Sequence, residues 1–89
     1  MLVRVKLTGK SDEYFIEIFD EEGYKFRGGR SEDFGDELEP GDYNATYHVR
    51  GTPDNKVTLK FTGVREPKKG TERTIPQKGF FSDNRAFKV

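Results

Sequence analysis

The sequence predicts an all-β fold, a small antiparallel β-sandwich of about six to seven strands. Two observations carry this prediction. Apolar and polar residues alternate with a period of two along several stretches, and turn-forming residues separate these stretches roughly every eight to twelve residues. No stretch keeps the 3.6-residue period of an amphipathic helix. A small barrel of the OB-like or SH3-like type has a similar strand pattern, and it is the alternative architecture.

Length and composition set the size of the core. The chain has 89 residues, so residues 1–89 are expected to form a single domain. Only 31% of them are hydrophobic and 36% are charged, which favours a thin core between two layers. The sequence contains no cysteine, which excludes thiol catalysis and cysteine-ligated zinc or iron–sulfur sites.

The first third of the chain contains two clear strands and the start of a third. VRVKL begins at residue 3 and YFIEIF at residue 14, with Phe15 and Phe19 on the polar side of the second strand. A turn at Asp20–Gly23 follows, and its glycine suits a position of positive φ. Tyr24 and Phe26 then resume the alternation. Six residues before the turn are expected to face the core: Val3, Val5, Leu7, Tyr14, Ile16 and Ile18.

The region from Gly28 to Glu39 is the least regular, and it is expected to be a loop. The Gly28-Gly29 pair predicts a bulge or bend where the preceding strand ends, and Phe34 and Leu38 are expected to lie beneath the loop.

Two clear strands and two short ones are expected after this loop. The two clear strands are separated by Thr52–Asn55, which is predicted to form a type I turn. The short strands are predicted near Arg73–Ile75 and Ala86–Val89. The inward residues of the two clear strands are predicted to be Tyr43, Ala45, Tyr47, Val49, Val57, Leu59 and Phe61.

Three stretches together resemble a known family: VRVKL, IEIFDEEG and LEPGDYNATYHVRG. They are similar to transthyretin-like modules, the carboxypeptidase-regulatory-like and collagen-adhesin B-type β-sandwiches. The similarity covers residues 3–62, and the basic sequence of residues 64–89 lies outside it. The resemblance implies a non-catalytic interaction module with an accessory or adhesive role, and it assigns no functional residue.

The net charge is zero, but the charges are unevenly distributed. Residues 31–55 hold seven acids and one cation, whereas residues 56–89 hold nine cations and three acids. The two segments either steer an anionic partner or face one another inside the fold.

No catalytic or cofactor site is predicted. The only histidine, His48, lies on the polar side of its strand, and none of Ser11, Ser31 and Ser82 occupies the strained turn that exposes a nucleophilic serine. We therefore expect the chain not to be an enzyme and to need no cofactor.

Residues 32–42 form an acidic loop with oxygen ligands of the kind that calcium prefers. The spacing of these acids fits no EF-hand, so a solvated acidic loop is the favoured interpretation and calcium-dependent binding is the remote alternative. No metal site is assigned. The acids concerned are Asp33, Asp36, Glu37, Glu39 and Asp42.

Two basic segments contain the candidate binding residues. In the first, cations alternate with Tyr24 and Phe26, which either stack nucleic-acid bases or fill the core. In the second, the adjacent Phe80 and Phe81 leave one ring exposed if they lie in a strand, and an exposed ring next to cations is typical of a protein interface. The equal alternative is a long loop whose phenylalanines close one end of the sandwich. The candidate residues are Lys25, Arg27, Arg30, Lys68, Lys69, Arg73, Lys78, Phe80, Phe81 and Arg85.

The sequence therefore predicts a non-enzymatic module that binds a protein partner, with single-stranded nucleic-acid binding as the alternative. Pairing of two copies through an edge strand is a further expectation. No stretch approaches the roughly 20 apolar residues of a membrane span. MLVRVKLTG reads as a strand and not as a signal peptide, which favours a cytoplasmic or virion-associated location.

Overall fold

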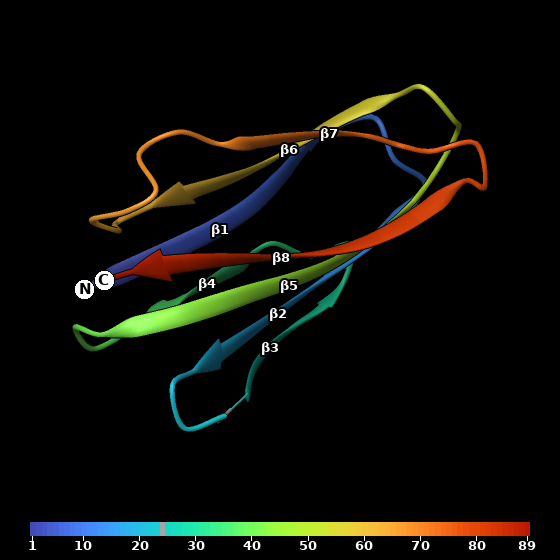
Figure 1. The fold of residues 1–89 in the computed structure, drawn as a ribbon. Helices are drawn as coiled ribbons and strands as arrows, with labels where there is room; N and C mark the ends of the chain where they lie inside the picture. The colour runs from blue at the N-terminus through green and yellow to red at the C-terminus, as the bar shows by residue number, and fades with distance from the viewer. Residues whose placement is uncertain (24) are drawn as a thin grey trace.

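The computed structural model describes the backbone of residues 1–23 and 25–89 and the side chains of residues 1–23 and 31–89. Two four-stranded antiparallel sheets pack face to face (Figure 1), which confirms the predicted β-sandwich. The described residues form no helix that could cross a membrane. The strands are β1 (Leu2–Gly9), β2 (Glu13–Asp20), β3 (Lys25–Arg30), β4 (Phe34–Glu37), β5 (Asp42–Arg50), β6 (Lys56–Thr62), β7 (Thr71–Thr74) and β8 (Phe80–Lys88).

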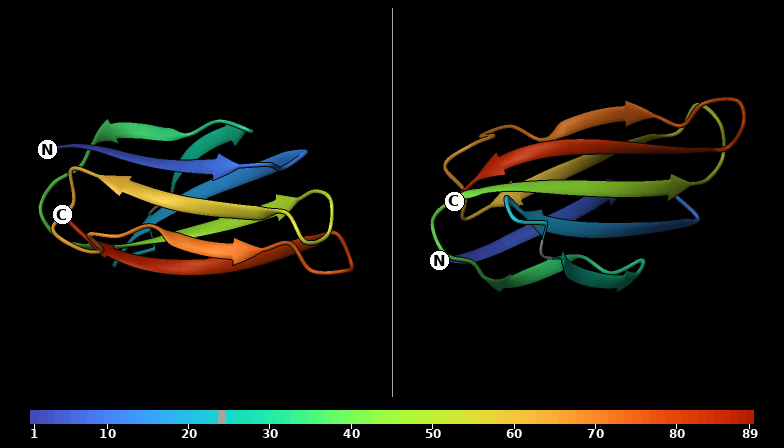
Figure 2. Two further views of the ribbon diagram at one scale, coloured as in Figure 1. Left: turned by 90° about the horizontal axis from the view of Figure 1, so that it is seen from above. Right: turned by 60° about the horizontal axis from the view of Figure 1, so that its bottom comes forward.

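Each sheet is assembled from strands that are distant in the sequence. Sheet A has the order β4-β1-β6-β7 and sheet B has the order β3-β2-β5-β8. The chain passes from β1 to sheet B, returns with β4, and crosses again for β5, β6 and β8 (Figure 2). The two chain ends lie at the same end of the sandwich. Each sheet therefore depends on contacts between residues that are far apart in the sequence.

The core lies between the sheets and consists of the inward residues of the alternating strands. Among the side chains that the structure describes, the core residues expected from the sequence are either buried or, like Tyr14 and Phe61, packed against the buried cluster. The rings of Tyr43 and Phe87 stack with their centroids 5.4 Å apart, and Phe61 lies 5.1 Å from Phe87. Aromatic contacts therefore fill the end of the sandwich where the chain ends meet.

The prediction that Gly28 to Glu39 form a loop is partly wrong, because this region contains β4. Phe34 pairs with Val5 across β1 and β4 and is buried, so a contact between distant residues stabilises a strand that the local sequence does not favour. The structure consequently has eight strands, one or two more than the six to seven expected.

The bulge predicted at Gly28-Gly29 is confirmed in the backbone. Phe15 pairs with Arg30 while Glu17 pairs with Arg27, so two residues of β3 face one residue of β2. The pair does not end the strand, since β3 continues through both glycines to Arg30.

The predicted type I turn at Thr52–Asn55 is wrong. Asp54 has a φ of 73°, which belongs to a type II turn, and the Asn55 N–H donates to the Thr52 carbonyl at 3.3 Å. The Asp54 N–H donates to the Ile75 carbonyl at 2.9 Å. This bond to the residue after β7 fixes the orientation of the turn, and aspartate tolerates the left-handed conformation that results.

A tyrosine and an aspartate link the sheets at each side of the core. On one side, the Tyr14 hydroxyl donates to Asp33 Oδ1 at 2.8 Å, and the Leu7 N–H of β1 donates to the same oxygen at 3.1 Å. On the other side, the Tyr47 hydroxyl donates to Asp83 at 3.4 Å, and Asp83 pairs with Arg73 of β7. The phenols thus have polar partners at both margins of an apolar core.

Burial controls the ionisation of these phenols. Burial, helped by the neighbouring aspartate, raises the pKa of Tyr14 and that of Tyr47 to about 12. An unfolded tyrosine loses its phenol proton near pH 10, whereas the folded protein holds this proton to a higher pH. Between these two pH values, ionisation of the phenol favours the unfolded state.

Stability should therefore fall as the pH rises from about 10 to 12, and Tyr47→Phe should make this fall shallower by up to about 1.4 kcal/mol per pH unit. Urea unfolding of the wild type and of the variant at several pH values checks this. Equal slopes for the two proteins above pH 10 would contradict it.

Two glycines with similar positive φ differ in their surroundings. Gly63 has a φ of 81°, and a Cβ on it would lie 2.1 Å from the Leu2 carbonyl oxygen of β1. Gly23 has a φ of 84°, and a Cβ on it would have nothing within 4 Å. Gly23→Ala should cost about 1–2 kcal/mol from the backbone conformation alone. Gly63→Ala should cost at least about 2 kcal/mol more, because β1 must move. Similar losses in urea unfolding would rule out this close approach.

Candidate functional site

The longest exposed edge of the sandwich is the outer edge of β8. β8 pairs with β5 along its whole length and with no other named strand, since β7 beside it belongs to sheet A. The other edge strands are shorter: β4 and β7 have four residues each, and β3, with six, contains the bulge. β8 has nine residues in a regular register.

The hydrogen bonds at the two ends of β8 show which of its residues point outward. Gly41 and Val89 exchange backbone bonds of 3.1 and 2.9 Å, and the Gly51 N–H donates to the Gly79 carbonyl at 2.9 Å. Antiparallel strands alternate between residues that bond to the partner and residues that point away. The odd-numbered residues of β8 therefore bond to β5, and the even-numbered residues direct their N–H and C=O groups to the free edge.

One end of this edge is closed and the rest is open. The Lys88 N–H donates to the Glu66 carbonyl at 2.8 Å, and the Arg65 N–H donates to the Lys88 carbonyl at 2.7 Å. No such bond between described residues reaches the outward groups of the preceding residues. We call this open stretch the β8 edge and define it by its outward residues Phe80, Ser82, Asn84 and Ala86.

The inward side chains of β8 include a buried ring and two charged residues. The Arg73 guanidinium lies over the Phe81 ring, 4.9 Å from its centroid, and pairs with Asp83. Arg85 lies opposite Ala45, is exposed, and forms no ion pair with a described residue. An inward charge beside an open edge disfavours pairing with an arbitrary apolar strand.

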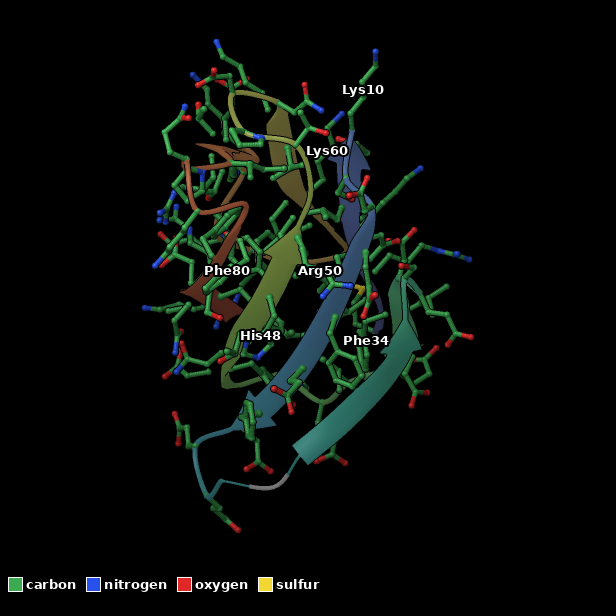
Figure 3. All side chains as sticks on the ribbon, turned by 90° about the vertical axis from the view of Figure 1, so that its right-hand side faces the viewer. Lys10, Phe34, His48, Arg50, Lys60 and Phe80 are labelled. Atoms are coloured by element: carbon green, nitrogen blue, oxygen red, sulfur yellow. The ribbon has the colours of Figure 1, made fainter. Side chains whose placement is uncertain are left out.

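The outward side chains of β8 begin with an exposed ring. Phe80 is 52% exposed, and the Lys78 ammonium lies 5.0 Å from its centroid. A hollow of about 170 Å³ next to it is lined in part by Phe15, His48 and Arg50. The side chains of Phe80, His48 and Arg50 can be followed in Figure 3. Since Phe81 is buried, the expectation that one ring of the adjacent pair is exposed is confirmed.

A hydrogen-bonded chain of three side chains crosses the outer face of sheet B. His48 Nδ1 lies 2.7 Å from Ser82 Oγ, and His48 Nε2 lies 3.0 Å from Glu17 Oε1. These residues come from β8, β5 and β2, and His48 and Ser82 are directly opposite in the register. The sequence analysis missed Ser82 as a partner because it predicted β8 only from Ala86 onward.

The order of these contacts differs from that of serine hydrolases. In those enzymes Nε2 of the histidine faces the serine and Nδ1 faces the acid, whereas here the two nitrogens are exchanged. Ser82 also lies within a regular strand instead of a strained turn, and the His48 side chain is 45% exposed. The arrangement fixes the orientation of the imidazole and joins three strands.

The structure brings six of the ten predicted binding residues to one region. Arg73, Lys78, Phe80, Phe81 and Arg85 lie on or beside β8. Lys68, in the loop between β6 and β7, lines a hollow together with Arg85, and Lys69 follows it in the same loop. Lys25, Arg27 and Arg30 lie on β3, at the opposite edge of sheet B. The predicted residues thus form no single surface. Tyr24 and the side chains of residues 25–30 lie outside the described part.

The acidic loop does not gather ligands for a cation. Asp33 accepts hydrogen bonds from Leu7 and Tyr14. Asp42 forms a hydrogen bond with Glu21 and thereby raises the pKa of the Glu21 carboxyl. Among the described side chains, no three acids or histidines come close enough to hold a metal ion.

The comparisons with known proteins identify no relative. No family model, no curated protein and no solved structure matches the chain. The resemblance to transthyretin-like modules therefore stays a prediction.

Two neighbouring residues of β7 allow a test of the link between the sheets. Arg73→Met should destabilise the fold by about 1–2 kcal/mol, because it removes the partner of Asp83 and the cation over Phe81. Glu72→Gln, which affects only an exposed 4.0 Å pair with Lys56, should change stability by less than about 0.5 kcal/mol. Thermal and urea unfolding check both. If the two losses were equal, Arg73 would not link the sheets.

Proposed function

We propose that this chain is a non-enzymatic interaction module that binds an extended strand of a partner protein at the β8 edge. The observation that carries the proposal is the run of outward backbone groups from Phe80 to Ala86. A peptide that adds to a sheet edge gains main-chain hydrogen bonds along the strand, and its alternate side chains supply specificity.

The side chains around the β8 edge support a selective partner. On the inner side, Arg85 would lie beside an inward side chain of the added strand, which favours a carboxylate at that position. On the outer side, the exposed ring of Phe80 would contact an apolar side chain of the same strand. We infer that the partner segment is extended and carries an acidic and an apolar residue on opposite faces.

Asn84 allows a test that changes the backbone edge and little else. Asn84→Pro removes one outward N–H, and proline is tolerated on an edge strand when its nitrogen faces away from the sheet. Asn84→Ala keeps the N–H and is the matched control. Peptides selected from a random display library on the immobilised wild-type protein serve as probes, and their affinities are measured by fluorescence anisotropy.

The selected peptides should bind Asn84→Ala as tightly as the wild type and Asn84→Pro at least about tenfold more weakly. Peptides with an acidic residue should also lose affinity for Arg85→Glu. Circular dichroism must show that each variant is folded. The proposal fails if the library yields no binder, or if its binders are insensitive to Asn84→Pro.

A further inference from the structure

The outer face of sheet A carries a group of cations that the β8 edge does not use. The inward positions of β1 and β6 are occupied by core residues, so the alternate residues of both strands face solvent. We call this surface the basic face. On the two central strands it consists of Arg4, Lys6, Thr8, Lys56, Thr58, Lys60 and Thr62.

At the centre of the basic face, Lys6 lies directly opposite Lys60 in the register of β1 and β6. Like charges in this position destabilise a sheet. Arg4, one step along β1 from Lys6, is opposite Thr62. No ion pair between described residues neutralises Arg4, Lys6 or Lys60. The fold therefore keeps an unfavourable concentration of positive charge on its surface.

The acids near the basic face lie at its margins. Glu37 on β4 pairs with the N-terminal amine, and Glu72 on β7 lies 4.0 Å from Lys56. Asp33 lines a hollow of about 350 Å³ together with Arg4 and Lys6, but it forms no ion pair with either of them. Lys10 projects beyond the end of β1 and extends the positive charge in that direction (Figure 3).

We infer that the basic face binds the phosphate backbone of duplex nucleic acid without sequence preference. Lysine, arginine and threonine side chains are typical donors to phosphate oxygens, and the threonines here alternate with the cations. The described residues of this face present no aromatic ring, so it lacks the stacking platform that single strands require. Contact with the charged backbone is the chemistry that remains.

A protein partner fits this surface less well. Protein interfaces have an apolar centre from which lysine is depleted, whereas lysines occupy the centre here. Leu2, the exposed apolar residue of this face, lies at its margin opposite Glu37. The inference is independent of the proposed strand binding, because the basic face and the β8 edge belong to different sheets.

The test compares two double variants that each remove two positive charges. Lys6→Gln/Lys60→Gln changes the basic face, and Arg50→Gln/Lys78→Gln changes the outer side of sheet B around Phe80. A short fluorescein-labelled DNA duplex is titrated with each protein at several salt concentrations, and anisotropy reports binding. For about four phosphate contacts, a plot of the logarithm of the wild-type binding constant against the logarithm of the salt concentration should have a slope of about −4.

Lys6→Gln/Lys60→Gln should weaken binding at least about tenfold and reduce the magnitude of this slope by about 2, whereas Arg50→Gln/Lys78→Gln should change affinity less than about twofold. The first variant should also melt at a higher temperature without DNA, because the repulsion between the two lysines is gone. Equal weakening by both variants, or a wild type that does not bind the duplex, would overturn the inference.

Two further measurements separate this inference from other occupants of the basic face. Sedimentation without DNA should show a monomer at low salt. Self-association that Lys6→Gln/Lys60→Gln abolishes would overturn the inference, because the acid-rich segment of residues 31–55 in a second copy would then cover the basic face. Asn84→Pro should bind the duplex as the wild type does. If it does not, the duplex reaches the β8 edge and the assignment to the basic face is wrong.

Discussion

The alternation of inward and outward side chains along the central strands is the constraint on which the rest of this structure depends. With 31% hydrophobic residues, the chain can fill only one side of each sheet. The inward positions of β1, β2, β5 and β6 are therefore apolar throughout the core. The same constraint places every remaining residue of these strands on an outer face. The charges that define the basic face are thus a consequence of how the core is built.

The margins of this thin core are polar and carry the links between the sheets. Tyr14 and Tyr47 extend from the apolar interior to the edge, where each hydroxyl meets an aspartate that also contacts the other sheet. Polar contacts at the margins leave the apolar volume intact and still fix how the sheets are aligned. Because Asp83 lies on β8, one of these links also holds the strand that presents the open edge.

The two outer faces and the open edge give one small sandwich several distinct surfaces. Sheet A presents cations, while sheet B presents Phe80 and the hydrogen-bonded chain through His48. The ion pairs Lys56–Glu72, Arg73–Asp83 and Lys88–Glu66 join residues within the C-terminal third. These pairs leave the acid-rich segment of residues 31–55 aside.

The sequence by itself determined the fold class, the inward residues of the clear strands and the turn at Gly23, because period-two patterns and turn chemistry are local signals. Only the tertiary structure decided the existence of β4, the full length of β8 and the conformation of Asp54. These features depend on pairing with residues far along the chain. The candidate surfaces divide in the same way. One exposed ring in the Phe80–Phe81 pair was predicted, whereas the pairing of Lys6 with Lys60 follows from a register that local sequence does not encode.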